Sequence, residues 1–243
     1  FPLIHLAETD STNRYLQDLC AHEEVKEMTT VTADYQTSGR GQRGNSWEGA
    51  PGQNLLFSVV LYPVFLEANQ QFLISQIVTL AIKEGLEQYT DEVSIKWPND
   101  IYWREKKICG ILIENDLMGR HISRSIAGIG LNINQERFES LAPNPVSLRQ
   151  ITGKAHDLQE VLQGILQRLH FYYEQLRRGE AETVSTLYKA SLFRREGFHP
   201  YKDANGIFQA RIFNIEPDGK LILEDADGHR RDYIFKEVEY LLT

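Results

Sequence analysis

The chain has 243 residues, a length that favours one large domain or one large domain plus a small one. Hydrophobic residues make up 42% and charged residues 25% of it, which is typical of a globular protein and excludes a collagenous or low-complexity chain. There are 26 Lys and Arg against 34 Asp and Glu, a net charge of −8, so no global positive field favours binding to nucleic acid or to anionic membranes.

The cysteine content and the lack of long apolar segments point to an intracellular protein. Cys20 and Cys109 cannot build a disulfide framework, and neither belongs to a CxxC pair that would indicate zinc or redox chemistry. No apolar run approaches the roughly 18 residues of a transmembrane helix, and the first residues lack the features of a signal peptide. We therefore expect a cytoplasmic protein with no membrane partner.

The first half of the sequence alternates helix and strand patterns. A cluster of N-cap residues predicts a helix that begins near residue 10 or 11, and a stretch rich in Thr and Val predicts a strand over 28–35. Residues 36–53 contain five glycines and are expected to form a long, mobile loop. An apolar strand over 55–62 and a helix over 73–86 follow.

The second half predicts further strands, then helices, then a β-rich end. Its short connections favour a mixed, largely antiparallel sheet, with strands over 93–97, 101–103, 108–114 and 122–133. Helical periodicity returns over 158–176 and 181–192. Turn sequences then recur about every ten residues, as in a meander of short strands. We expect an α+β domain of residues 1–192, with helices packed on its sheet, and a small β-barrel of residues 193–243.

The first candidate site is the glycine-rich segment Gly39-Arg40-Gly41-Gln42-Arg43-Gly44-Asn45-Ser46-Trp47. Glycines let backbone N–H groups approach a phosphate closely, and arginines offer forked donors to phosphate or carboxylate oxygens. Trp47 could lie against an adenine ring. The alternative is a solvated loop that its Trp anchors to the core, and the segment fits neither the Rossmann fingerprint nor the Walker loop.

Two further lysine-containing segments are candidates. Lys96-Trp97-Pro98-Asn99-Asp100 ends a strand with groups that suit phosphate and Mg²⁺, although Pro-Asn-Asp is also a common turn. The segment Lys106-Lys107-Ile108-Cys109-Gly110 starts a strand with two lysines, of which only one need have a functional role. Its glycine marks either a place where a ligand approaches the backbone or a β-bulge. Cys109 is expected to be a small buried hydrophobe, because nothing marks a histidine partner for it.

The last candidate segment is Gly128-Ile129-Gly130-Leu131-Asn132, which would expose strand backbone and offer an amide to a base edge. Its alternative is a strand softened by glycine that ends in a turn. The seven histidines show no metal-ligand spacing and are expected to be structural or exposed.

Five segments in chain order resemble the motif series of the biotin protein ligases, also called biotin–[acetyl-CoA-carboxylase] ligases: Asp10-Ser11-Thr12-Asn13 and residues 36–47, 96–100, 107–114 and 128–132. The resemblance covers nearly the whole chain. It implies the catalytic fold shared by class II synthetases and biotin and lipoate ligases over residues 1–192. It also implies a small SH3-like domain over residues 193–243.

The resemblance implies a two-step reaction. Biotin's carboxylate attacks the α-phosphorus of ATP, with Mg²⁺, to give biotinyl-5′-AMP and pyrophosphate. A lysine of a biotin carboxyl carrier protein or domain, such as that of acetyl-CoA carboxylase, then attacks the mixed anhydride and releases AMP. A basic mobile loop that orders over the ligand would supply cations and exclude water.

Matching positions of the family motifs imply roles for particular residues. Biotin binding is implied for Ser11, Thr12, Gln36, Gly39, Arg40, Lys107 and Gly110. Contacts with ATP and the adenylate are implied for Trp47, Lys96, Asn99 and Asn132. Catalytic roles are implied for Lys107, Arg40 and Arg43, with Lys107 beside the biotin carboxylate and the α-phosphate, and Asp100 is the implied Mg²⁺ ligand.

The glycine-rich segment departs from the usual family pattern Gly-Arg-Gly-Arg-x-x-Arg-x-Trp. The second and third arginines are replaced by Gln42 and Asn45, and an arginine stands instead at Arg43. The second arginine of the family helps to retain the adenylate. We expect either a leakier enzyme or compensation by Arg43.

The family signature begins at residue 10, which leaves no room for the helix-turn-helix domain of members that double as repressors, so DNA binding is not expected. Two other functions stay open. A lipoate or octanoate transferase shares the catalytic fold but carries an Arg-Arg-x-x-Gly-Gly-Gly type segment, and a biotin-binding module would lack catalysis. Oligomeric state is also open, because the family includes monomers and homodimers.

Overall fold

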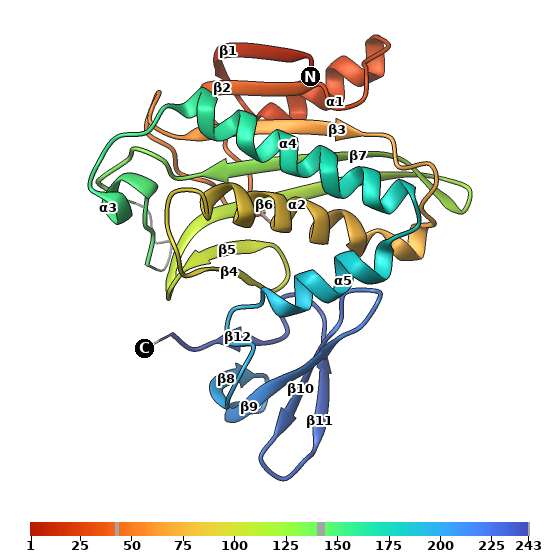
Figure 1. Ribbon diagram of the computed structural model, residues 1–243, viewed down its shortest axis with the longest axis vertical. Helices are drawn as coiled ribbons and strands as arrows, with labels where there is room; N and C mark the ends of the chain where they lie inside the picture. Colours follow the sequence, from red (N-terminus) through yellow and green to blue (C-terminus); the bar gives the residue numbers. More distant parts are fainter. Residues whose placement is uncertain (42–43, 140–143, 243) are drawn as a thin grey trace.

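The computed structural model describes residues 1–41, 44–139 and 144–242. Within them, the strands form two sheets, drawn one above the other in Figure 1. The larger has seven strands in the order β1-β2-β3-β7-β6-β5-β4. Its bounds are β1 Leu3–Thr9, β2 Thr30–Gln36, β3 Leu55–Leu61, β4 Val93–Lys96, β5 Asp100–Trp103, β6 Lys106–Met118 and β7 His121–Leu131. β1 and β2 pair in parallel and the other neighbouring pairs are antiparallel, which confirms the predicted mixed sheet.

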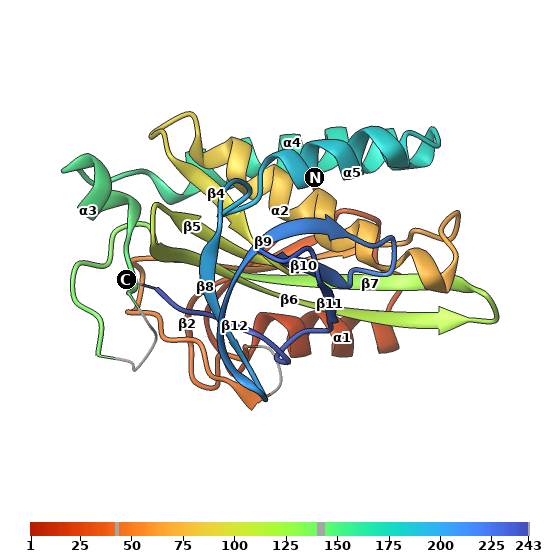
Figure 2. The ribbon, with the colours of Figure 1, turned by 90° about the horizontal axis from the view of Figure 1, so that it is seen from below.

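Helices cover both faces of this sheet. The bounds are α1 Thr12–His22, α2 Phe72–Leu86, α3 Leu148–Thr152, α4 Leu158–Arg177 and α5 Ala181–Ala190, with a 3₁₀ turn at Ala68–Gln70. Figure 2 shows α2, α4 and α5 on one side of the sheet and α1 on the other. The predicted strand over 55–62 is apolar except for Ser58 and Tyr62, because β3 lies in the middle of the sheet with both faces buried.

The alternation of side chains along β3 connects the two cores. Phe57 and Val59 lie in the large apolar cluster with α2 and α4, whereas Val60 packs in a smaller cluster under α1 with Leu16 and Val31. Ser58 also faces α1, because successive side chains of a strand point to opposite faces. That register places a hydroxyl beside the first residues of α1.

The C-terminal strands form the second sheet, in the order β11-β10-β9-β8-β12 within the described residues. Their bounds are β8 His199–Asp203, β9 Gly206–Ile215, β10 Leu221–Asp225, β11 Arg230–Tyr233 and β12 Glu239–Tyr240. This sheet confirms the predicted β-rich end. It packs closely on the larger part: the indole of Trp97 donates to the carbonyl of Gly219 at 2.8 Å.

Two elements were missed by the sequence patterns. β1 alternates poorly because it is an edge strand with mostly exposed side chains, so it has no clear period of two. α3 is only five residues long, too short to show helical periodicity, although its capping box of Ser147 and Gln150 and its left-handed Gly153 are readable signals. The strand predicted over 108–114 is also longer than expected, because β6 continues into a hairpin with β7.

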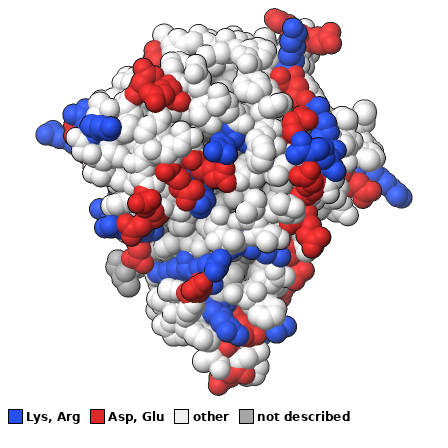
Figure 3. All heavy atoms as spheres, in the orientation of Figure 1, with Lys and Arg blue, Asp and Glu red and all other residues white. Residues whose placement is uncertain are grey.

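No helix of the described residues combines the length and the apolar character needed to cross a bilayer. On the face shown in Figure 3, acidic and basic side chains are interspersed, and neither sign covers it.

Candidate active site

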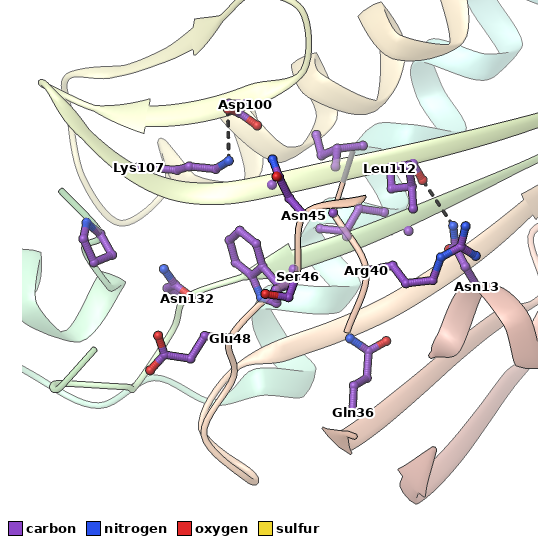
Figure 4. Close-up of a pocket in the computed structure, with 18 of the residues that line it drawn as sticks. Asn13, Gln36, Arg40, Asn45, Ser46, Glu48, Asp100, Lys107, Leu112 and Asn132 are labelled. Carbon is purple, nitrogen blue, oxygen red and sulfur yellow. Dashed lines mark hydrogen bonds and ion pairs between the residues drawn. The ribbon is translucent and has the colours of Figure 1, made fainter. Parts of the chain in front are cut away.

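The predicted motifs converge on one cavity of about 630 Å³, which lies between the glycine-rich segment and strands β4 to β7. This volume suits a small organic ligand. Its lining includes these sequence-predicted residues: Ser11, Thr12, Gln36, Arg40, Trp47, Lys96, Asp100, Lys107, Gly110 and Asn132. Figure 4 shows Gln36, Asn13 and Arg40 on one side of it and Lys107 and Asp100 on the other. The cavity therefore has two chemically different ends.

One end is a hydrogen-bonded cluster at the start of α1. The Gln36 Oε1 atom accepts from the Thr12 backbone N–H at 2.8 Å and lies 3.1 Å from the Thr12 hydroxyl. Ser58 Oγ lies 2.7 Å from Thr12 Oγ1 and 2.6 Å from Asn13 Oδ1. Ser11 has extended N-cap backbone angles but makes no side-chain cap, so its hydroxyl is left to line the cavity. This end offers hydroxyls and amides at fixed positions.

A carboxylate connects this cluster to the glycine-rich segment. Glu114 accepts from the Asn13 amide at 2.8 Å and from the Arg40 guanidinium at 3.1 Å, one with each oxygen. Glu114 is on β6 and Arg40 is 74 positions earlier in the chain. Neither Ser58 nor Glu114 was predicted as a site residue, because their importance depends on strand register and not on local sequence.

The floor between the two ends is strand backbone without side chains. Gly110 of β6 pairs directly with Gly130 of β7, and Gly128 lies opposite Leu112. The group that approaches these glycines is the indole of Trp47: a Cβ on Gly110 would stand 2.6 Å from its Cζ3, and one on Gly130 would stand 2.4 Å from its Nε1. A Cβ on Gly128 would collide with the Asn13 amide at 2.2 Å. The glycines of both segments are thus required by packing within the chain.

The other end of the cavity carries two lysines whose ammonium groups have different partners. Lys107 Nζ lies 3.0 Å from Asp100 Oδ2 and 5.7 Å from the Trp47 ring centre. The Lys96 ammonium makes no ion pair or hydrogen bond with a described residue; its Nζ instead lies 5.3 Å from the Tyr102 ring centre and 4.9 Å from that of Tyr240. Burial lowers the pKa of Lys96, and Asp100 opposes that shift. An ammonium that lines a cavity and has no carboxylate in direct contact within the described residues is suited to an anionic ligand.

Two polar atoms in the wall have no partner. The Nε1 of Trp47 and the Oδ1 of Asn132 are buried without a hydrogen bond within the described residues. Asn132 is otherwise tightly held, since its Nδ2 donates to the Val146 carbonyl at 3.2 Å and its backbone joins residues 108 and 148. Buried unpaired donors and acceptors are costly. A ligand that supplied their partners would remove that cost.

Asp100 does not form a multi-carboxylate metal site. Its carboxylate pairs with Lys107, and the one group of three His, Cys, Asp or Glu ligand atoms that lie close together in the described chain is Asp225, Asp227 and His229, in the β10–β11 turn. There the Asp225 carboxylate already accepts the backbone N–H groups of the other two residues. Asp100 belongs to no such group within the described residues, so it would suit a metal ion that arrives bound to phosphates and needs few protein ligands.

Two predicted residues lie behind the cavity wall, and one lies outside the described residues. The Asn99 side chain is buried and its Nδ2 lies 3.4 Å from the Ile111 carbonyl. Gly39 accepts the Trp47 backbone N–H at 2.9 Å, and a Cβ there would stand 2.6 Å from the Trp47 carbonyl oxygen, so it shapes the loop. Arg43 is outside the described residues. Cys109 is buried, as predicted, and burial raises its pKa well above the usual value.

A polar cluster that the sequence did not reveal fastens the end of the glycine-rich segment. Buried Gln135 accepts from the Ala50 backbone N–H at 3.0 Å and from the Asn54 amide at 2.6 Å. Its Nε2 lies 3.2 Å from a Glu48 oxygen, and that oxygen also accepts the Glu139 backbone N–H. Nothing local distinguishes Gln135 from a solvated loop residue. The cavity lining that sequence reasoning missed also includes Tyr102, Phe138, Pro145 and Phe235.

Comparisons with known proteins agree with this site. The model of the biotin/lipoate A/B protein ligase family matches residues 6–132, just over half of the chain. The biotin–[acetyl-CoA-carboxylase] ligase of Paracoccus denitrificans is 34% identical over 241 residues, which cover 93% of this chain and 95% of that protein. The bifunctional ligase/repressor BirA of Bacillus subtilis is 29% identical over 236 residues, 95% of this chain and 72% of that protein.

The fold agrees as well. The biotin protein ligase from Aquifex aeolicus in complex with biotin and ATP matches with a TM-score of 0.81 and 27% identity, covering 99% of each chain. Sequence, fold and site thus lead to the same conclusion. This chain belongs to the biotin/lipoate A/B protein ligase family.

Proposed function

We propose that this protein is an ATP-dependent biotin protein ligase, which makes biotinyl-5′-AMP and transfers the biotinyl group to a lysine of a biotin carboxyl carrier protein or domain. The observation that carries the proposal is the two-ended cavity, with hydroxyls and amides at one end and an unpaired lysine at the other. The full-length relative named as a biotin–[acetyl-CoA-carboxylase] ligase and the similar structure that holds biotin and ATP support it.

Biotin's ureido ring would bind at the hydrogen-bonded end. Thr12 and Gln36 offer donors and acceptors that their own contacts hold in place, and Ser11 adds a residue to the same wall of the cavity. The glycine floor around Gly110 is apolar and close to the backbone, which suits a fused ring system, and Arg40 lies at the rim, paired with Glu114. Gly39 acts through the shape of the loop.

ATP would bind with its phosphates at the lysine end. Lys96 supplies an ammonium that makes no ion pair with a described residue, and Lys107 lies beside the glycine floor. Trp47 and Asn132 would face the nucleotide with their unpartnered atoms, and Asn99 would support the wall from behind. Mg²⁺ would enter as part of Mg–ATP, with Asp100 as one protein ligand at most.

In the first step, a biotin carboxylate oxygen bonds to the α-phosphorus while the bond to the bridging oxygen of the β-phosphate breaks, and pyrophosphate leaves. Lys107 would neutralise the repulsion between carboxylate and α-phosphate, and Lys96 would stabilise charge on the departing phosphates. In the second step, the amine of the acceptor lysine bonds to the biotinyl carbonyl carbon, loses a proton, and AMP leaves with the bridging oxygen. The glycine-rich segment would protect the anhydride from water, with Arg43 replacing the family arginine absent at position 42.

The rest of the molecule fits a cytoplasmic enzyme with two domains. We place the catalytic domain in residues 1–192 and the SH3-like domain in residues 193–243. Arg194 follows the boundary; its side chain is buried and donates to the Leu241 carbonyl at 2.7 Å and to the Pro200 carbonyl at 3.2 Å. The junction is thus held firmly.

One assay tests the proposal against the two alternatives. ATP–pyrophosphate exchange is measured with biotin, lipoate and octanoate offered separately, and exchange is expected with biotin alone. Exchange with lipoate or octanoate alone would identify an enzyme of the same fold that acts on lipoate or octanoate. The absence of exchange with every acid, together with binding of biotin, would leave a non-catalytic binding module.

A further inference from the structure

Lys96 is held in the cavity by aromatic rings from two different sheets. Its ammonium nitrogen lies 5.3 Å from the centre of the Tyr102 ring, on β5, and 4.9 Å from the centre of the Tyr240 ring, on β12. Both distances are within the range of a cation–π interaction. No carboxylate of the described residues lies within ion-pair distance of Lys96. Asp100, its cross-strand neighbour, attracts the ammonium from farther away but pairs with Lys107. The two rings are therefore the described groups that this ammonium faces directly.

Tyr240 is fixed in place by the C-terminal sheet. It pairs with Tyr201 of β8, and the two rings meet edge to face with centres 4.9 Å apart. The next residue, Leu241, receives the Arg194 guanidinium on its carbonyl and donates its N–H to the Pro200 carbonyl. Figure 1 shows β12 on the side of the small sheet that faces β4 and β5. A residue of β12 thus lies against Lys96, which lines the cavity.

The ring of Tyr240, and not its hydroxyl, makes this contact. The hydroxyl oxygen is buried without a hydrogen-bond partner within the described residues. A buried hydroxyl that makes no bond costs free energy, so packing alone would be served as well by phenylalanine. The ring, which also packs against Phe193 and Tyr201, is the part of Tyr240 that faces Lys96.

We propose that Tyr240 is a positioning residue for ATP: its ring, together with that of Tyr102, holds the Lys96 ammonium toward the phosphates, so the C-terminal sheet contributes directly to nucleotide affinity. This inference rests on the assignment of the lysine end to ATP in the proposed function. It adds a residue that no motif of the sequence contains.

The test compares Tyr240→Phe, which keeps the ring, with Tyr240→Leu, which removes it. In ATP–pyrophosphate exchange, Tyr240→Leu is expected to raise the KM for ATP about fivefold to thirtyfold and to leave the KM for biotin within twofold. Tyr240→Phe is expected to match the wild type. The matched control is Tyr233→Leu, which removes a tyrosine of the same sheet with the same 6% exposure and is expected to lower Tm without changing either KM.

A second series keeps the packing intact in case Tyr240→Leu does not fold. Phenylalanine with one, two or three ring fluorines at position 240 withdraws electrons from the ring face and preserves its shape. The KM for ATP is expected to rise stepwise with the number of fluorines. A flat series would overturn the proposal, as would an equal defect in Tyr240→Phe and Tyr240→Leu, or a loss in kcat with the KM for ATP unchanged.

Thermal denaturation with and without ATP separates this inference from the proposed function. ATP is expected to raise the Tm of the wild type and of Tyr240→Phe more than that of Tyr240→Leu. If the wild type binds ATP in this manner but shows no biotin-dependent exchange, the proposed function fails and the role of Tyr240 stands. If exchange occurs and the ATP-induced shift in Tm is independent of Tyr240, the role of Tyr240 fails alone.

Discussion

The indole of Trp47 lies against the bare backbone of Gly130, so close that a Cβ on Gly130 would stand 2.4 Å from both Nε1 and Cε2. Gly110, which pairs with Gly130 across β6 and β7, meets the same ring at Cζ3. The position of Trp47 thus depends on two adjacent strands that lack side chains at this point. Because the backbone at these glycines also forms the cavity floor, a side chain added there would disturb both the glycine-rich segment and the cavity.

Substitution of Gly130 by alanine is expected to displace Trp47 and to lower kcat/KM for biotin-dependent exchange by more than tenfold, because the contact distance leaves no room for a methyl group. The fold should persist, as judged by circular dichroism. Gly164→Ala is the matched control. Gly164 lies in α4, and a Cβ there would have its nearest neighbouring atoms at 3.8 Å or more. The variant should therefore keep full activity, and its free energy of unfolding should rise by about 0.5–1 kcal/mol. Activity of Gly130→Ala within twofold of the wild type would contradict the prediction.

Lys107→Gln is expected to lower the rate of biotinyl-5′-AMP formation by roughly 100-fold or more, because it removes the cation nearest the glycine floor. The measurement is single-turnover formation of the adenylate. Lys106→Gln is the natural control, since the adjacent Lys106 is exposed and should be neutral within twofold. Equal effects at the two positions would show that charge near the strand, rather than the position of Lys107, matters.

Ser58→Ala is expected to weaken biotin binding several-fold and to cost about 1–3 kcal/mol of stability, because both Thr12 and Asn13 lose a buried hydrogen-bond partner. Titration calorimetry with biotin and urea denaturation measure the two effects. Ser125→Ala is the control: Ser125 is equally buried, on β7, but its hydroxyl has no partner within the described residues, so its removal should be neutral or stabilising. The prediction is wrong if the two variants behave alike.

Gln135→Leu is expected to loosen the end of the glycine-rich segment, because the Ala50 N–H and the Asn54 amide both lose their acceptor while the side-chain volume is nearly kept. Hydrogen exchange at Ala50 should accelerate at least tenfold, and the KM for biotin should rise. Gln209→Leu, at an exposed position of β9, should leave both unchanged. An unaltered rate of hydrogen exchange at the Ala50 N–H would show that Gln135 does not hold the end of the glycine-rich segment in place.

Stability in acid should depend on Glu27. Burial would raise the pKa of Glu27, but hydrogen bonds from the Tyr173 hydroxyl, the Tyr62 backbone N–H and Arg177 outweigh it and hold the pKa below the usual 4.5. The unfolded chain therefore binds this proton more readily than the folded chain. The stabilisation is fully present above pH 4.5 and is lost as the pH falls through the folded-state pKa.

The free energy of unfolding of the wild type should therefore exceed that of Glu27→Gln by a constant amount near neutral pH. This difference should shrink below pH 4.5. Glu24→Gln, at an exposed position three residues earlier, should differ from the wild type by less than 0.5 kcal/mol at every pH. A difference for Glu27→Gln that does not change with pH would contradict the assigned linkage.

Most elements were predictable from local patterns, and most of the predicted residues that line the cavity were named through the resemblance to the family motifs. Helical periodicity identified α1, α2, α4 and α5, Thr and Val content identified β2, and apolar runs identified β3 to β7. β1 and α3 escaped, since an edge strand is mostly exposed and a five-residue helix is too short to be periodic. For the glycines of both strand motifs, close approach of a ligand was one of two open interpretations; the groups that approach them are Trp47, at Gly110 and Gly130, and Asn13, at Gly128.

The sequence by itself determined which chemical groups the protein brings to its site, because each motif carries its lysine, amide or glycine within a few residues. Only the tertiary structure decided how these groups are paired. The β4–β5 register sets Asp100 opposite Lys96, but the Asp100 carboxylate forms its ion pair with Lys107 of β6, so the Lys96 ammonium has no carboxylate of the described residues within ion-pair distance. The partner of Lys96 is then a ring from residue 240, 144 positions away, because contacts between distant segments follow from packing and leave no mark in local sequence.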